Sequence, residues 1–308
     1  MNKKILISAL ALMGSSLMAS AQVTNDSTEL IEPGVMYVDP LFEYPVAPEE
    51  LNEFSEKCNW LAVNFWNPLD LKTKEAVDQN KLNHAFNVYA TTVQYADKDV
   101  VTAAVDKMMK NLQKNPMLTY QMIKAAEETI YGPRADFWID ELYARMLSSA
   151  LANKKFPKTK RARYEHQLKQ LENSLIGKTP ASFDFVRPNG DTAQYFPMST
   201  PTIIIFGDPD CDECRMGKLR MQSNITFNKA VSDGKINVLF IIPDPDAGWE
   251  ENVTDFPKNW TVGASESIDD IYDIREIPEI YVIGSDGKII GKHISVMEAM
   301  SRTLSLIN

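Results

Sequence analysis

The chain has 308 residues, of which 44% are hydrophobic, and its formal net charge is −10 at pH 7. This length favours about two domains, each with its own core. An acidic protein repels phosphate backbones, so the charge argues against nucleic acid as a partner. Three cysteines are too few for a small disulfide-stapled scaffold.

Residues 1–21 have the features of a secretory signal peptide. Lys3 and Lys4 form a basic end, residues 5–18 form an apolar run, and small residues follow up to Ala21, after which we expect cleavage. The apolar run is shorter than the roughly 20 residues of a spanning helix, and no later stretch is long and apolar enough to span. The first cysteine is Cys58, so no lipid-anchored form is expected. These features predict a soluble, exported protein, located in the periplasm.

The N-terminal half is predicted to be helical. Residues 22–47 read as an extended lead-in, and residues 48–156 as an all-helical domain in which apolar residues recur every three or four positions. The predicted helices cover residues 51–65, 82–93, 101–112, 118–131 and 137–153. Residues 157–176 form a charged linker helix. We interpret the basic run between Lys154 and Arg163 as a solvated helix face.

From residue 177 onward the pattern changes to short apolar runs. Residues 182–186 and 192–195 flank an Asn-Gly turn and predict a β-hairpin. Runs of the buried-strand type follow at 202–206, 238–242 and 280–283, and the helical stretches between them indicate parallel crossovers with helices on both faces of the sheet. A turn returns the chain to 288–291, and a closing helix begins at Val296. Residues 177–308 are therefore predicted to form one α/β domain.

A Cys-x-x-Cys pair lies where the first buried strand gives way to a helix. This position places Cys211 at a helix N-terminus, which stabilises negative charge and so favours the reactive thiolate. Cys214 falls about one helical turn later, within bridging reach, and can resolve a mixed disulfide. The expected chemistry is a redox-active Cys211-Cys214 disulfide.

Two other interpretations of the pair remain open. A structural disulfide would close a very short loop, which removes little chain entropy. A zinc site would need two further ligands, and the histidines and Cys58 lack paired spacing. We therefore predict no metal and no cofactor.

Several motifs together resemble the exported thioredoxin-like thiol-disulfide oxidoreductases that serve cytochrome maturation (TlpA/ResA-like, AhpC/TSA-related). They are Gly-Lys-Thr-Pro-Ala-Ser-Phe from Gly177, the strand-Cys-x-x-Cys-helix order, and Ile-Pro-Glu-Ile-Tyr-Val-Ile from Ile277 followed by Asp-Gly-Lys. The resemblance implies a thioredoxin-like α/β fold, a central mixed sheet flanked by helices with an N-terminal hairpin, preceded by the all-α domain. It also implies that Pro278 is cis beside the dithiol and that the backbone of Ile277 binds an extended substrate. The N-terminal helices resemble a helical domain of unknown function often found ahead of such domains.

The sequence departs from this family around the cysteines. Ile205 replaces the buried acid that thioredoxins carry six residues before the first cysteine. Proton transfer to or from Cys214 then needs another group, and Asp208, Asp210 and Glu213 are the candidates. Because these carboxylates oppose the charge of a thiolate, we expect the dithiol to act on the reducing side.

Other conspicuous residues are predicted to be structural. Cys58 lies on an apolar helix stripe and reads as a core residue; the alternative is a partnership with the dithiol. The three histidines are isolated in sequence and receive no catalytic role. The aromatic pairs near Phe65 and Phe137 read as core, or as the lining of a substrate groove. Trp249 and Trp260 either cover the sheet edge or shape the substrate surface.

The predicted function is thiol-disulfide exchange on exported proteins. Its partners would be protein disulfides or dithiols, and a membrane or periplasmic redox protein would restore the dithiol. The alternative is a non-enzymatic binding module that uses the thioredoxin-like half as a scaffold.

Overall fold

The computed structural model describes residues 38–73 and 75–307. The predicted signal peptide and the first part of the predicted lead-in lie outside these residues. Two compact units divide the chain, the first ending at Ala162 and the second running from Arg163. In the described part of the chain, no helix is both long and apolar enough to cross a bilayer.

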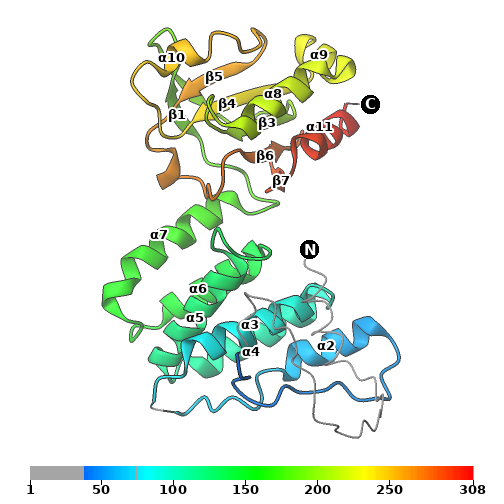
Figure 1. Ribbon diagram of the computed structural model, residues 1–308, viewed down its shortest axis with the longest axis vertical. Coiled ribbons are helices and arrows are strands. Elements are labelled where there is room, and N and C mark those ends of the chain that lie inside the picture. Colours follow the sequence, from blue (N-terminus) through cyan, green and yellow to red (C-terminus); the bar gives the residue numbers. More distant parts are fainter. Residues whose placement is uncertain (1–37, 74, 308) are drawn as a thin grey trace, which may run out of the picture. The chain divides into compact units, whose positions relative to one another are not determined.

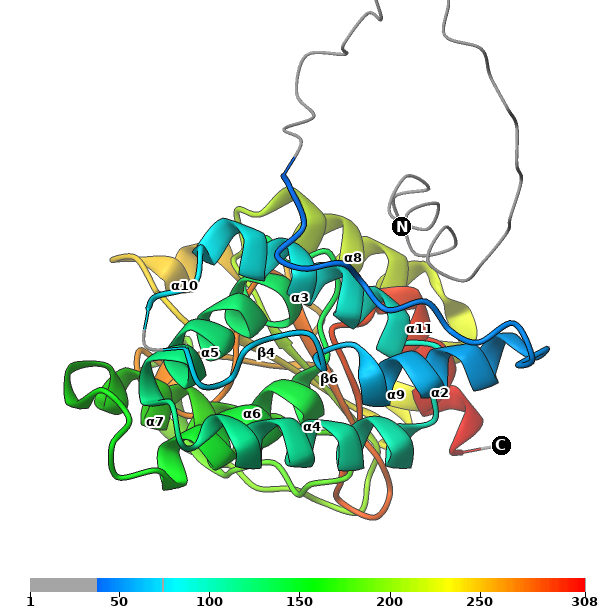
Figure 2. The ribbon, with the colours of Figure 1, turned by 90° about the horizontal axis from the view of Figure 1, so that it is seen from below.

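The first unit contains five helices among its described residues (Figures 1 and 2). They are α2 (Phe54–Asn64), α3 (Gln79–Val93), α4 (Lys98–Leu112), α5 (Pro116–Ile130) and α6 (Asp140–Ala152). The apolar residues at three- and four-residue spacings form the buried faces, which include Leu82, Val105 and Met146. Asp78 and Asn115 cap α3 and α5, because their side chains accept hydrogen bonds from the first free backbone amides.

Two of the predicted helices begin later than expected. Helix α2 begins at Phe54, whereas the prediction placed its start at residue 51. Helix α6 begins at Asp140, so Phe137 and Trp138 precede it and are not helical. The segment before α6 is held against the end of α5: the amide of Ile139 donates to the carbonyl of Ile130 at 3.1 Å, which replaces a helical hydrogen bond.

Helix α7 (Lys158–Ser174) corresponds to the predicted linker helix. The division between the two units falls within it, between residues 162 and 163. Its basic first half is largely exposed, but Tyr164 is buried and half-buried Arg161 donates to the carbonyls of Leu151 and Asn153. Its later half buries Leu171 and Ser174. The domain limits drawn from the sequence stay a prediction.

The second unit contains one mixed sheet of seven strands in the order β2-β1-β5-β4-β3-β6-β7. Its strands are β1 (Phe183–Val186), β2 (Thr192–Tyr195), β3 (Thr202–Phe206), β4 (Asn237–Ile242), β5 (Thr261–Ala264), β6 (Glu279–Ile283) and β7 (Ile289–Lys292). Strand β3 runs parallel to β4 and antiparallel to β6, and β4 runs parallel to β5. The central strands β3 and β6 are buried on both faces, as their unbroken apolar sequences predict.

One face of the sheet is covered by helices. Residues of α8 (Asp212–Ser223), α9 (Ile225–Ser232) and α11 (Val296–Ser305) pack there against Ile203, Ile205 and Val238. Figure 1 shows these three helices together in the second unit. Trp249, in the short helix α10 (Trp249–Asn252), and Trp260 are buried in the same cluster.

The other face differs from the prediction of helices on both sides. Its apolar cluster draws Ile268 and Tyr272 from the 3-10 turn η1 (Ile268–Asp270) and the loop that follows it. The hydroxyl of Tyr272 donates to the carbonyl of Ala181 at 2.6 Å, which ties this loop to the segment before β1. A short turn replaces a long helix here because β1 and β2 contribute Phe183, Phe185 and Tyr195 to the same cluster.

Candidate active site

The sheet topology brings the two cysteines and the Ile277-Pro278 peptide to one edge. Strand β3 ends at Phe206, whose partners are Ile241 of β4 and Glu279 of β6. Because β6 is antiparallel to β3, the peptide that precedes Glu279 arrives where the chain leaves β3 for α8. The Ile277-Pro278 peptide bond is cis, which confirms the conformation that the resemblance implied.

Cys211 occupies the N-cap of α8. Its Sγ accepts a hydrogen bond from the amide of Cys214 at 3.4 Å and lies 3.8 Å from the carbonyl oxygen of Ile277. The side chain is half-buried, whereas Cys214 is only 5% exposed, and both residues are thiols. A helix N-terminus with a free amide aimed at sulfur is a site that stabilises a thiolate.

The environment of Cys214 keeps its thiol protonated. Its pKa is raised to about 12, mainly by burial and also by the hydrogen bond and charge of Cys211. The charge of Asp208 acts in the same direction, while a hydrogen bond with the backbone of Asp208 opposes it. One sulfur is therefore accessible, and the other is held back in the neutral form.

A small hollow borders the buried sulfur. Cys214, Pro278 and Lys218 line it, together with the apolar side chains of Ile205, Phe240, Trp260 and Val296. Ile205 therefore stands beside Cys214, where the resemblance implied a buried acid. The backbone of residue 207 packs closely against two residues that line this hollow, and this requires a glycine. A Cβ at this position would lie 2.7 Å from Cζ of Phe240 and 3.2 Å from Sγ of Cys214.

The three carboxylates predicted for proton transfer occupy different positions. Asp208 acts electrostatically on Cys214, and its Oδ1 accepts a hydrogen bond from the amide of Asp210 at 2.8 Å. Glu213 lines the hollow beside Cys214. Asp210 is exposed, and no described contact joins its side chain to either sulfur. The structure thus brings Asp208 and Glu213 near Cys214, and their role in proton transfer stays a prediction.

The sequence reasoning missed Lys218, a buried cation in this site. Its Nζ bonds to Asp255 at 2.6 Å and lies 4.3 Å from the ring centroid of Phe256. Its side chain is 9% exposed, while that of Asp255 is 71% exposed. The signal available in the sequence was the helical spacing, since Lys218 follows Cys214 by four residues and shares its face of α8.

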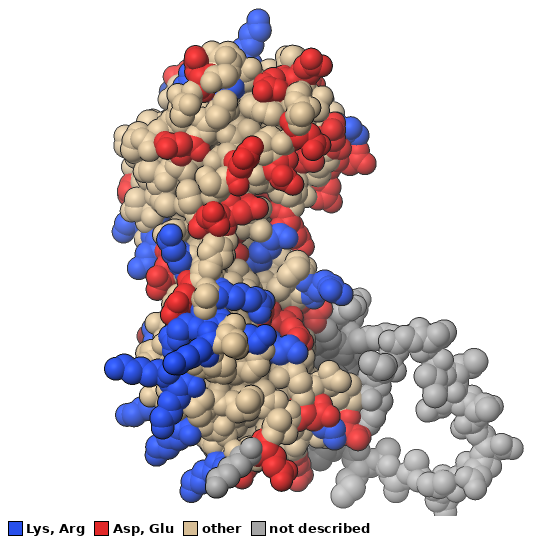
Figure 3. Space-filling view, turned by 90° about the vertical axis from the view of Figure 1, so that its left-hand side faces the viewer, with Lys and Arg blue, Asp and Glu red and all other residues tan. Residues whose placement is uncertain are grey.

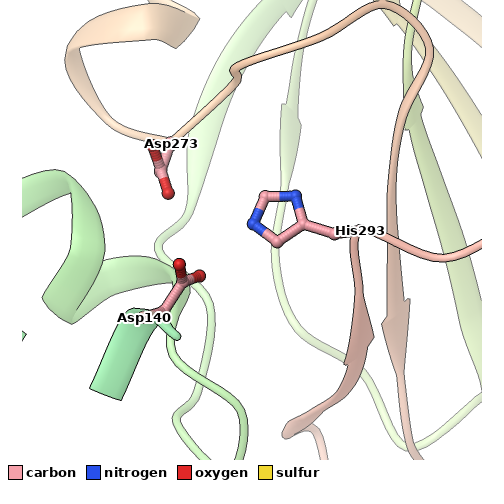
Figure 4. A group of neighbouring side chains, drawn as sticks. All are labelled: Asp140, Asp273 and His293. Atoms are coloured by element: carbon pink, nitrogen blue, oxygen red, sulfur yellow. The ribbon is translucent and has the colours of Figure 1, made fainter. Parts of the chain in front are cut away.

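Buried charges anchor the segment that leads to Pro278. Asp273 bonds to Nζ of Lys292 at 2.6 Å, and its backbone carbonyl accepts from the hydroxyl of Tyr281 at 2.7 Å. Next to Pro278, Glu279 bonds to Nδ1 of His293 at 2.7 Å. Figure 4 shows the side chains of Asp273 and His293; Asp140, also drawn, belongs to α6 of the first unit. His293 is thus paired within the fold, which its isolated place in the sequence did not indicate.

The remaining conspicuous residues have structural surroundings. Cys58 is fully buried in a cluster with Ala47 and Leu61, and burial raises the pKa of its thiol. In the first unit, Phe65 and Trp66 are buried and stack edge to face at 5.0 Å between ring centroids. The prediction that Cys58, Phe65 and Trp66 are part of the core is confirmed, whereas Phe137 and Trp138 are half-buried.

Comparisons with known proteins give one family match and several structural similarities. Residues 14–174 match the family described as a domain of unknown function, DUF5106. Among curated proteins, none matched. The structure is similar to that of a thioredoxin-like protein from Bacteroides caccae, with a TM-score of 0.71, 16% identity, and coverage of 87% of this chain and 99% of that chain. This similarity shows the fold, and the second unit is thioredoxin-like.

Two shorter structures align with part of the chain. A conserved protein of unknown function from Bacteroides fragilis is 28% identical, with a TM-score of 0.39, over 42% of this chain and 98% of that chain. The thioredoxin domain of a thiol-disulfide oxidoreductase from Bacteroides vulgatus is 15% identical, with a TM-score of 0.36, over 44% of this chain and 99% of that chain.

Proposed function

We propose that this chain, which belongs to the family described as domain of unknown function DUF5106, is a thiol-disulfide oxidoreductase that acts through Cys211 and Cys214. The observation that carries the proposal is the arrangement of the two sulfurs: a half-buried Cys211 at a helix N-terminus, 3.8 Å from the carbonyl of Ile277, and a buried Cys214 whose amide bonds to it. A structural disulfide would not need one partner to be accessible.

The reaction has two exchanges. The Cys211 thiolate attacks a substrate disulfide, so that the substrate S–S bond breaks, a mixed disulfide forms, and one substrate sulfur leaves and takes up a proton. Cys214 then loses its proton and attacks Sγ of Cys211, which releases the second substrate thiol. The substrate gains two electrons and two protons, and the two cysteines end as a disulfide.

The first exchange prepares the second. The hydrogen bond and charge of Cys211 both raise the pKa of Cys214. In the mixed disulfide Cys211 carries no charge, so this contribution disappears when the Cys214 thiolate is needed. In this mechanism the proton passes to one of the three candidate carboxylates, of which Asp208 and Glu213 are near Cys214 and Asp210 is exposed, and the backbone of Ile277 and Pro278 holds the extended substrate.

The proposal extends to the direction and place of the reaction. The acidic residues Asp208, Asp210 and Glu213, which lie next to the two cysteines in the sequence, support action on the reducing side. The signal-like residues 1–21 support export to the periplasm, where a second redox protein would restore the dithiol. A TlpA/ResA-like subtype is part of the same proposal and depends on the sequence motifs.

The test is reduction of insulin, followed as turbidity, with a small dithiol as electron source. We expect activity in the wild type and in Cys58→Ser, a matched control whose thiol is fully buried in the first unit. Cys211→Ser should abolish activity, and Cys214→Ser should accumulate a mixed disulfide visible by mass spectrometry. Activity that survives Cys211→Ser would falsify the mechanism, and a wild type inactive with every disulfide would favour the binding module.

A further inference from the structure

The loops around the dithiol are strongly acidic. Strands β3, β4 and β5 are parallel and β6 is antiparallel, so the loops after the first three and the loop before β6 meet at the dithiol edge. Residues 207–213, 243–248 and 265–278 contain 11 acidic residues and one basic residue, Arg275. The side chain of Arg275 is buried against Asp273, so it does not offset the charge of the surface.

Several of these carboxylates are exposed and uncompensated. Asp244, Asp246 and Glu276 are exposed, and none of them forms an ion pair within residues 38–73 and 75–307. The acids of different loops are also close to one another. Partial burial, followed by the charges of Asp244 and Asp270, raises the pKa of Asp269. Such crowding of like charges destabilises the unoccupied edge and is relieved when a cation binds.

Three exposed lysines of the second unit lie at the opposite edge of the sheet, whereas beside the dithiol Arg215 of α8 is paired with Asp212 and buried Lys218 is paired with Asp255. Exposed Lys235 precedes β4, exposed Lys258 precedes β5, and exposed Lys288 lies in the turn between β6 and β7. Figure 3 shows acidic side chains gathered over the second unit on the face in view. The loops at the edge that presents Cys211 therefore carry an excess of negative charge.

We propose that the substrates of this dithiol are polypeptides with basic residues beside the reactive disulfide. The inference rests on the proposed function and names its substrate class. An extended segment that follows the backbone of Ile277 to reach Cys211 runs beside Glu276, at the edge of the sheet where the loop that carries Asp244 also lies. Lysine or arginine near the disulfide relieves the repulsion there, whereas acidic neighbours add to it, so encounter rates depend on substrate charge.

The test compares two synthetic peptides of equal length that each contain one disulfide. One has lysines on both sides of the cysteines and the other has glutamates, and 2-hydroxyethyl disulfide is the uncharged probe. Reduction by the dithiol form of the full chain is measured with EDTA present, at low and high salt. We expect the basic peptide to react at least about tenfold faster at low salt, and high salt should diminish this ratio.

Two variants with equal net charge locate the effect. Asp244→Asn, Asp246→Asn and Glu276→Gln together should bring the two peptide rates close to each other and leave the uncharged probe unchanged. The control Glu172→Gln, Asp191→Asn and Asp286→Asn removes three exposed carboxylates from α7 and two turns, and it should keep the preference.

The outcomes separate the two proposals. Equal rates for both peptides, with the uncharged probe reduced, would overturn the substrate class and leave the oxidoreductase proposal intact. A preference that persists in the first triple variant or disappears in the control would also overturn it. No reduction of any probe would refute the proposed function itself.

Discussion

Cys214 should be almost inert to alkylation in the folded protein. Its pKa rises from the usual 9.0 to about 12, so its thiolate fraction at pH 8 falls from about one in ten to about one in ten thousand. Because iodoacetamide reacts with the thiolate, we expect Cys214 to be modified about a thousandfold more slowly than an ordinary cysteine. Half-buried Cys211, which is accessible, should be modified first. Mass spectrometry of samples quenched at intervals gives both rates.

Replacing Cys211 with alanine tests the cause of this difference. The variant removes a hydrogen bond and a charge that both raise the pKa of Cys214, so alkylation of Cys214 at pH 8 should become faster. It should stay slower than for an ordinary cysteine, since burial is the larger cause and remains. Equal rates for the two cysteines in the folded wild type, or no acceleration in Cys211→Ala, would contradict the reasoning. Circular dichroism at each pH verifies that the protein is folded.

Three substitutions test the packing and polar contacts around the site by the urea midpoint of unfolding. Gly207→Ala should lower stability by about 1–3 kcal/mol, because its Cβ would collide with Phe240; an unchanged midpoint would mean that the ring moves away freely. Asp273→Asn should cost about 3–5 kcal/mol, since it removes the carboxylate that bonds to buried Lys292, and a loss below 1 kcal/mol is inconsistent with that bond. Tyr272→Phe should cost about 1 kcal/mol through its lost hydrogen bond, and a stabilised variant would show that the bond contributes nothing.

The parts of the fold with strong local patterns were predictable. Residues 202–206 and 280–283 are continuous apolar runs, and both are buried strands, β3 and β6. Strand β5 was missed because it has four residues, begins with an exposed threonine and contains Gly263. That glycine has a packing reason, since a Cβ there would collide with the ring of Phe185. Gly263 is required by its packing against a neighbouring strand, and glycine is not a residue type that predicts a strand.

The part of the candidate site that is encoded by a local motif was predictable, whereas contacts between residues far apart in the sequence were not. The spacing of Cys211 and Cys214 shows their positions on α8 directly. Lys218 is buried because Asp255, 37 residues later, bonds to it, and His293 is paired because β7 returns beside β6. Such pairs depend on which distant segments the folded chain brings side by side, and the local sequence pattern does not indicate this.

The anchoring of Asp273 has a consequence for how a partner docks. Hydrogen bonds from Tyr281 and Lys292 fix the peptide ahead of Ile277 from inside the molecule. The backbone that an incoming substrate segment would contact is therefore held in place before the substrate binds, so binding need not order a loop. The conformational entropy lost on binding is then mainly that of the substrate. A cyclic disulfide peptide with a constrained backbone should therefore bind more tightly than a flexible disulfide peptide of the same composition.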